Sequence, residues 1–177
     1  MSDLNILLAG FGGQGILFTG KVIAYAGMME GKEVSWLPSY GPEMRGGTAN
    51  CSVCLSDAII GSPLVTNPDV LVAMNLPSLE KFESEVVPGG LIIVDSSIIT
   101  RKVQRDDVKV VYLDASNIAE SNGFKGAANM VILGRMFRET GFCSEENLDR
   151  GLQKSIPPKK AALLDSNRKA ISLGRES

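Results

Sequence analysis

The 177-residue chain contains no histidine. This absence excludes histidine general bases, Ser-His-Asp and Cys-His triads, and every metal site that requires an imidazole ligand. Cysteine is also scarce, with Cys51, Cys54 and Cys143 as the three examples. A small odd number argues against a disulfide scaffold. A four-thiolate iron–sulfur cluster needs more cysteines than the chain has.

An excess of charge of one sign is also lacking, because the formal net charge is −2. The balance therefore favours neither nucleic acid nor an acidic membrane surface as a partner. The most apolar long stretch, Ile16–Met29, contains Lys21 and is shorter than the ~18 apolar residues of a membrane span. The N-terminus lacks the positive charge of a secretion signal. We expect a cytoplasmic protein that binds no nucleic acid and no membrane.

The order of apolar runs and turn residues predicts strands that alternate with helices. The predicted strands are Leu4–Ala9, Glu33–Leu37, Thr48–Leu55, Val70–Met74, Leu91–Val94 and Val108–Leu113. The predicted helices are Ile16–Met29, Leu76–Val87, Ile118–Ser121, Ala127–Thr140, Glu145–Lys154 and Lys160–Leu173. Several strands are apolar without interruption, which is typical of strands that are covered on both faces.

This alternation predicts an α/β fold with three layers, α/β/α, and a mainly parallel, Rossmann-like sheet. Ser56 and Asp57 can turn the third strand into a short partner at Ala58–Ile60, which would add an antiparallel hairpin. We expect residues 1–177 to form a single domain with a helical C-terminal segment at about 143–177. Because Ile16–Met29 is apolar on most sides, it is either deeply buried or partly covered by another subunit.

A glycine-rich turn separates the first predicted strand from the first predicted helix. Gly10, Gly12 and Gly15 match G-x-G-x-x-G, a pattern in which glycines allow a tight turn and the helix N-terminus presents N–H groups to an anion. A dinucleotide site would also need an acidic residue at the end of the second strand, and that end reads Leu37-Pro38-Ser39. We select Gly12, Gly13, Gln14 and Gly15 as candidate cofactor or anion contacts. A tight packing turn is the alternative.

The segment 38–47 is a second glycine-rich loop, reading PSYGPEMRGG. Ordering such a loop costs conformational entropy, so a contact is expected to hold it. Tyr40, Glu43 and Arg45 are candidate interface residues. Arg45 is also a candidate anion contact, because a guanidinium can bind phosphate or carboxylate through two hydrogen bonds. A solvated loop with a surface ion pair is the alternative.

Cys51 and Cys54 have the spacing of a C-x-x-C motif. On a strand, residues three apart point to opposite faces, so two such thiols are poorly placed to bind one metal ion. We therefore predict buried apolar packing for both and no metal site in this chain.

Three segments together resemble a known family. Residues 7–16 read LLAGFGGQGI, residues 39–49 read SYGPEMRGGTA, and residues 88–97 read PGGLIIVDSS. These motifs, with Asn67-Pro68-Asp69 between them, are similar to the γ subunit or γ domain of 2-oxoacid:ferredoxin oxidoreductases. The resemblance spans about residues 4 to 140 and is greatest to the 2-oxoglutarate type.

The resemblance implies a subunit without catalytic residues of its own. In that family a larger complex decarboxylates a 2-oxoacid, transfers the acyl group to coenzyme A and reduces ferredoxin. Thiamine diphosphate, Mg²⁺ and [4Fe-4S] clusters are then expected on α, β and ferredoxin-like δ subunits. This chain lacks the Gly-Asp-Gly of the thiamine motif and the cysteines for clusters, so we expect no cofactor in it.

Two functions of different classes remain open from the sequence. The first is the γ subunit described above, which would complete or cover an active site formed by its partners, and the resemblance makes the glycine loop and Arg45 candidate contacts for coenzyme A. The second is a free-standing nucleotide- or dinucleotide-binding protein. An apolar surface that awaits a partner would also make the isolated chain form a homodimer.

Overall fold

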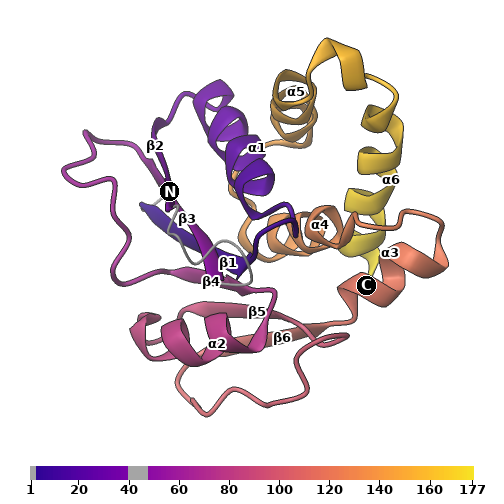
Figure 1. The fold of residues 1–177 in the computed structure, drawn as a ribbon. Coiled ribbons are helices and arrows are strands. Elements are labelled where there is room, and N and C mark those ends of the chain that lie inside the picture. Colours follow the sequence, from indigo (N-terminus) through magenta and orange to yellow (C-terminus); the bar gives the residue numbers. More distant parts are fainter. Residues whose placement is uncertain (1–2, 40–47) are drawn as a thin grey trace.

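The computed structural model describes residues 3–39 and 48–177, and its core is a six-stranded sheet in the order β2-β3-β1-β4-β5-β6 (Figure 1). The strands are β1 Leu4–Phe11, β2 Glu33–Ser39, β3 Thr48–Ser56, β4 Val70–Ala73, β5 Leu91–Asp95 and β6 Lys109–Leu113. The helices are α1 Ile16–Met29, α2 Leu76–Phe82, α3 Ala115–Ser121, α4 Ala128–Thr140, α5 Glu145–Ser155 and α6 Leu163–Glu176, with short 3₁₀ turns η2 Glu83–Glu85 and η3 Pro158–Lys160.

Strand β3 is antiparallel to the other strands of the sheet. Strands β1, β4, β5 and β6 are mutually parallel, whereas β3 lies between β2 and β1 and is antiparallel to both. The mixed α/β sheet confirms the predicted fold class. The hairpin expected at residues 58–60 is wrong, because these residues form no strand and the antiparallel partners of β3 are β1 and β2.

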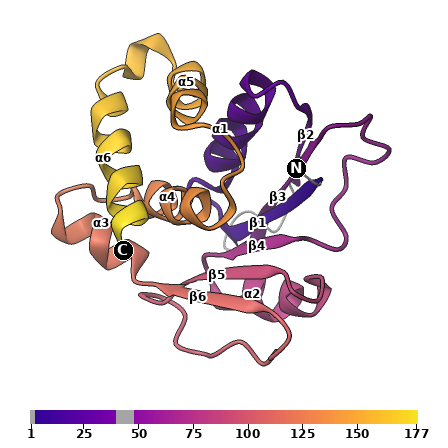
Figure 2. The same ribbon diagram turned by 180° about the vertical axis from the view of Figure 1, so that it is seen from behind.

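The two faces of the sheet are covered unequally. Helices α1, α4, α5 and α6 lie on one side and α2 lies on the other (Figure 1). α1 packs on β2 and β3, α5 packs on α1, and α6 crosses over α4. Seen from behind, α6 ends beside α3 (Figure 2).

Alternation along the strands explains this layering. Successive β-strand side chains point to opposite faces, and in β3 the side chains of Cys51, Val53 and Leu55 join the core under α1 and α4. Cys54, between them, packs in the second core with Leu79 of α2. β4 and β5 are buried at every residue, as their uninterrupted apolar sequences predict.

Glycines allow helices to approach their neighbours closely in the helix-rich layer. A Cβ at Gly20 would lie 2.5 Å from the Sγ of Cys51, and one at Gly27 would lie 2.5 Å from Leu55, so α1 rests directly on β3. A Cβ at Gly134 or Gly174 would overlap the backbone of the opposite helix where α4 and α6 cross. Helix α1 is therefore buried by this chain itself over most of its length.

Most sequence predictions of element bounds differ from the structure by a few residues. β2 continues through Pro38 to Ser39, whereas the predicted strand ended at Leu37. β2 is an edge strand, and an edge strand tolerates proline because the missing N–H need not pair. α6 begins at Leu163, three residues later than predicted, because Lys160 belongs to the 3₁₀ turn η3.

Candidate functional site

The glycine-rich turn lies at the carboxyl end of β1, where open α/β sheets place their ligand sites. Two of its residues have positive φ, Gly13 at 93° and Gly15 at 77°. This backbone is strained for a residue with a Cβ, so glycine is required there for the turn itself. The motif therefore has a structural explanation before any ligand is considered.

Gln14 fixes the turn with both ends of its amide. Its Oε1 accepts from the N–H of Phe11 at 2.6 Å, and its Nε2 donates to the carbonyl of Met74 at 2.9 Å. These bonds tie the end of β1 to the end of β4. The Gln14 side chain thus positions the loop, and its polar atoms are already engaged by the backbone.

The N-terminus of α1 has no side-chain cap and no acidic residue in its first turn. The N-cap is Gly15 itself, in the left-handed conformation. Uncapped N–H groups and the helix dipole both favour an anion at such a position. The geometry is that expected of a phosphate or carboxylate contact.

Asn129 of α4 holds the turn from behind, and the sequence analysis did not identify it. Its Nδ2 donates to the carbonyl of Gly15 at 3.3 Å and to Oγ1 of Thr19 at 3.2 Å. Asn129 and Thr19 are both buried. A lone asparagine in a helix belongs to no motif, so only the fold reveals this contact.

The carboxyl ends of β5 and β6 form a second polar cluster next to the turn. The Asp95 carboxylate is fully buried and accepts from Ser116 Oγ at 2.6 Å and from the N–H of Ser97 at 3.1 Å. Asp114 accepts from Ser97 Oγ at 2.6 Å. These contacts anchor the start of α3 to the sheet, so both aspartates act as structural links.

A cavity of about 210 Å³ opens between the glycine turn and α3. It is lined by Gly13, Gln14, Met74, Ser116, Ala119, Glu120, Lys125, Gly126 and Ala128. The fold thus brings the candidate residues Gly13 and Gln14 together with the residue after β4 and with α3 and the segment that follows it. We call this cavity the glycine-turn pocket.

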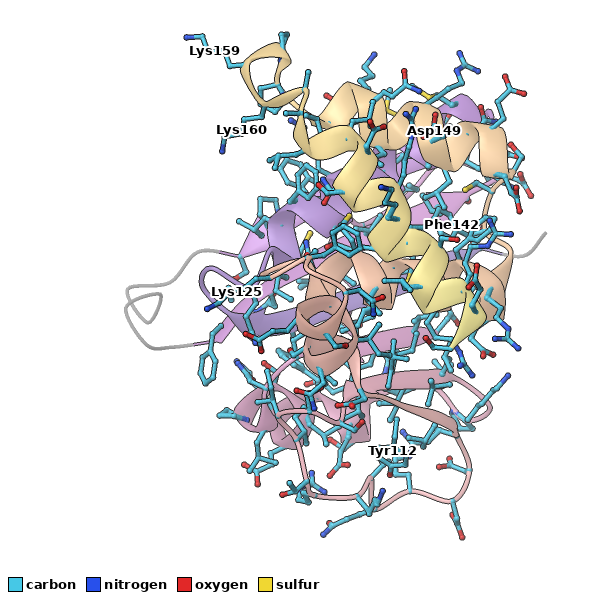
Figure 3. All side chains as sticks on the ribbon, turned by 90° about the vertical axis from the view of Figure 1, so that its right-hand side faces the viewer. Tyr112, Lys125, Phe142, Asp149, Lys159 and Lys160 are labelled. Atoms are coloured by element: carbon cyan, nitrogen blue, oxygen red, sulfur yellow. The ribbon has the colours of Figure 1, made fainter. Side chains whose placement is uncertain are left out.

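Lys125 supplies a cation at the glycine-turn pocket and was not singled out from the sequence. Its side chain is exposed and extends on the same side of the molecule as the turn (Figure 3). Glu120, from the end of α3, places a carboxylate on the same lining. The pocket therefore combines residues Gly13 and Gln14 of the turn, one cation and one anion.

The remaining candidate residues are not placed together with this pocket. Tyr40, Glu43 and Arg45 lie outside the described residues. Gly12 belongs to the turn but does not line the pocket. Asn75, which follows β4, is fully buried as the N-cap of α2, where its Oδ1 accepts from the N–H of Ser78.

The cysteines are inert in this fold. All three are buried and free, and burial raises the pKa of Cys51 and of Cys143 to about 12. The thiol form therefore predominates at neutral pH, and thiols bind metal poorly. Cys51 and Cys54 face different cores, as predicted. Within residues 3–39 and 48–177, no three His, Cys, Asp or Glu side chains gather as metal ligands.

No helix among the described residues has the length and apolar character needed to span a bilayer.

Comparison with known proteins places the chain in a family. The model of the family described as pyruvate ferredoxin/flavodoxin oxidoreductase matches residues 5–177. Ketoisovalerate oxidoreductase subunit VorA of Methanothermobacter thermautotrophicus is 40% identical over 98% of this chain, which spans 36% of that relative. 2-Oxoglutarate synthase subunit KorC of Methanocaldococcus jannaschii is 35% identical, over 86% of this chain and 83% of the relative. The chain thus spans about a third of one type of relative and most of another.

Solved structures share the fold. The γ subunit of the keto/oxoacid ferredoxin oxidoreductase from Geobacter sulfurreducens matches with a TM-score of 0.84 and 30% identity, over 98% of this chain and 96% of that one. The 2-oxoglutarate:ferredoxin oxidoreductase of Magnetococcus marinus, solved with 2-oxoglutarate, coenzyme A and succinyl-CoA bound, matches with a TM-score of 0.87 and 26% identity, over 99% of this chain and 31% of that chain. With the family model matching nearly every residue, the chain belongs to the pyruvate ferredoxin/flavodoxin oxidoreductase family.

Proposed function

We propose that the chain is the γ subunit of a 2-oxoacid:ferredoxin oxidoreductase. The observation that carries the proposal is the end-to-end match to the Geobacter γ subunit, which covers almost all of both chains. Relatives that act on ketoisovalerate, 2-oxoglutarate and indolepyruvate all appear among the matches. Among these substrates we propose 2-oxoglutarate, because several relatives matched over most of their length are 2-oxoglutarate synthase subunits.

The proposed overall reaction converts 2-oxoglutarate and coenzyme A into succinyl-CoA and CO₂. Two electrons leave the substrate in this step and reduce two molecules of one-electron-accepting ferredoxin, with release of a proton. In the proposed complex the thiamine diphosphate, Mg²⁺ and [4Fe-4S] clusters are bound by partner subunits. The residues of this chain do not fit these groups, because its thiols are buried and its described carboxylates form no ligand cluster.

Within this proposal the glycine-turn pocket binds part of coenzyme A. Lys125 favours an anion in the pocket, the uncapped N-terminus of α1 begins two residues after Gln14 of the lining, and the phosphates of coenzyme A are anionic. A volume of about 210 Å³ is below the 300 Å³ at which pockets usually enclose a whole drug-sized ligand. The pocket is therefore suited to one phosphate-bearing portion of the molecule.

The site assignment is tested in the assembled enzyme with Lys125→Ala and Arg45→Ala. Each substitution should raise the KM for coenzyme A several-fold and leave the KM for the 2-oxoacid unchanged. Lys159→Ala serves as a matched control, because Lys159 lies in the connection before α6, far from the pocket (Figure 3). Equal kinetics for wild type and Lys125→Ala, with the complex intact, would remove coenzyme A from this pocket, and equal kinetics for Arg45→Ala would remove the proposed contact at Arg45.

The subunit assignment is tested by tagging the chain in its native host and purifying it without oxygen. Large partner chains, bound iron and decarboxylation of 2-oxoglutarate should accompany it. Activity toward another 2-oxoacid would keep the subunit role and change the substrate. A chain that purifies alone and without iron would contradict the proposed function.

A further inference from the structure

The glycine-turn pocket lies where two helices begin. Gly13 and Gln14, which line the pocket, come just before α1, and Gly126 and Ala128, which also line it, lie at the start of α4. The two helices contact each other. The shape of the pocket therefore depends on how the start of α4 is held against the start of α1.

Asn129 hydrogen-bonds the start of α4 to the start of α1. Its Nδ2 donates to the carbonyl of Gly15, the N-cap of α1, at 3.3 Å and to Oγ1 of Thr19 at 3.2 Å. A Cβ at Gly15 would overlap this Nδ2, so the close approach requires glycine. Asn129 is 6% exposed and Thr19 is 3% exposed. Because both are buried, water does not readily replace these bonds when one partner is removed.

The carbonyl of Gly15 accepts three hydrogen bonds. Besides Nδ2 of Asn129, the N–H and the Oγ1 of Thr19 each donate to it at 3.0 Å. The same peptide group carries the N–H of Ile16, which is the first residue of α1. Hydrogen bonds to a carbonyl polarise its peptide group and make that N–H more positive. Asn129 thus fixes the start of α1 and also strengthens the attraction of this helix end for an anion.

Asn129 also restrains the turn that carries Lys125, the cation of the pocket. This turn is closed by a bond from the N–H of Ala127 to the carbonyl of Phe124 at 2.9 Å, and Gly126 within it has a φ of 83°. Lys125 lies four residues before Asn129 in the chain. A shift of the start of α4 would therefore change the distance between Lys125 and the glycine turn.

We propose that Asn129 is a positioning residue for coenzyme A, which holds the two sides of the glycine-turn pocket at the separation that fits a phosphate of this substrate. The inference rests on the proposed function of the pocket. Asn129 does not line the pocket, so it acts through Gly15 and Lys125. An amide suits this role because it donates without adding charge, whereas a buried carboxylate would repel both the Gly15 carbonyl and the bound anion.

The test compares kinetic constants of the assembled enzyme. Asn129→Ala removes both hydrogen bonds, and Asn129→Asp keeps the shape but replaces the donor with a carboxylate. Asn147→Ala is the matched control, because Asn147 joins α5 to the opposite end of α1, where its Nδ2 donates to the carbonyl of Met29 at 3.2 Å. The KM for coenzyme A, the KM for the 2-oxoacid and kcat are measured for each variant, and thermal unfolding checks folding.

We expect Asn129→Ala to raise the KM for coenzyme A about three- to tenfold, the equivalent of one net hydrogen bond, with kcat and the KM for the 2-oxoacid unchanged. Asn129→Asp should raise the KM for coenzyme A further, and added salt should reduce the difference between the two variants by screening the new charge. Asn147→Ala should lower thermal stability and leave all three constants unchanged. A purely structural role of Asn129 would produce the same result as this control.

The outcomes separate this inference from the proposed function. An unchanged KM for coenzyme A in both Asn129 variants, with a raised KM in Lys125→Ala, would overturn the positioning role and leave coenzyme A in the pocket. An unchanged KM in Lys125→Ala would overturn the pocket assignment, and this inference with it. An equal rise in Asn147→Ala would show that any loosening of α1 has this effect, which also overturns the role of Asn129.

Thr19 provides a second test if the Asn129 variants do not assemble. Thr19→Val keeps the shape but lacks the hydroxyl that accepts from Asn129, whereas Thr19→Ser retains it. Thr19→Val should raise the KM for coenzyme A, and Thr19→Ser should have the wild-type value. Equal constants for these two variants would overturn the inference.

Discussion

The two faces of the sheet differ in how much protein covers them. On one face α1 and α4 contact the strands, and α5 and α6 form a further layer over those helices. On the other face α2, seven residues long, covers part of the sheet and a loop covers another part. Side chains are buried under both faces, but two layers of helices cover the first face, whereas one short helix and a loop cover the second.

Matched leucine-to-alanine substitutions give the largest test of this contrast. Leu133 of α4 and Leu79 of α2 are both fully buried, one on each side of the sheet. Both variants should lose stability, by about 2–5 kcal/mol. Leu133→Ala should lie at the upper end, because the double helical layer cannot collapse into the cavity. Urea unfolding measures both values, and a larger loss for Leu79→Ala would refute the proposed difference between the faces.

The crossing of α4 and α6 provides the next test. A Cβ at Gly134 would overlap the backbone of Ile171, and this atom cannot rotate away. Gly134→Ala should therefore force the helices apart and destabilise the protein by about 1–3 kcal/mol. Gly61→Ala is the control, because no atom lies within 4 Å of its added Cβ. Equal urea midpoints for the two variants would show that the outer helical layer is loosely held.

The sequence predicted secondary structure best where neighbouring residues alone determine an element and its bounds. The bounds of α1 were correct because Gly15 and Gly31, both with positive φ, delimit an unbroken helical pattern. β4 and β5 were recognised because complete burial selects continuous apolar runs. Such elements need no knowledge of their neighbours.

The sequence failed where a distant partner decides the outcome. β3 was expected to turn back on residues 58–60, yet β1 and β2 pair with it along its whole length. The glycine turn was recognised as a candidate site, but Lys125 and Asn129 were not, because each reaches it from a segment more than a hundred residues later. The amide of Gln14 was taken for a ligand contact, and its engagement with Phe11 and Met74 becomes visible only when β1 and β4 are aligned.

Gln14→Glu tests the hydrogen bonds that join the end of β1 to the end of β4. A carboxylate cannot donate to the carbonyl of Met74, so two acceptors would face each other at the present 2.9 Å. The loss should be about 1–3 kcal/mol. Asn122→Asp is the control, because the same type of amide-to-carbonyl bond, to Ile118, is exposed there and water can replace it. Thermal unfolding of both variants at neutral pH gives the comparison, and equal losses would show that Gln14 does not hold the turn.

The smallest expected effect concerns an ion pair at the rim of the covered face. Lys109 of β6, together with Arg135, holds the pKa of Glu139 below its ordinary value of 4.5. A lowered pKa in the folded state contributes stability above about pH 4.5, and this contribution is lost as the pH falls through the folded pKa. Because Lys109 is 64% exposed, the contribution should be under ~1 kcal/mol.

Glu139→Gln should therefore be less stable than wild type at pH 7, and the two should converge below pH 4. Unfolding curves between pH 3 and pH 7 check this. A constant difference across the range would show that Glu139 contributes through packing and not through its charge.

The reversed strand β3 also affects how the chain can fold while it is being synthesised. β1 and β2 make no hydrogen bonds to each other, since β3 lies between them. When residue 39 leaves the ribosome, neither strand has its hydrogen-bonding partner, and α1 has only β1 and β2 to pack on. The sheet can begin to close only after residue 56 has emerged, and α1 remains uncovered on its outer side until α5 follows. An emerging chain with such a delay exposes apolar surface to chaperones and neighbouring chains, so the first sixty residues are the part of this protein that stays incompletely covered while later elements are synthesised.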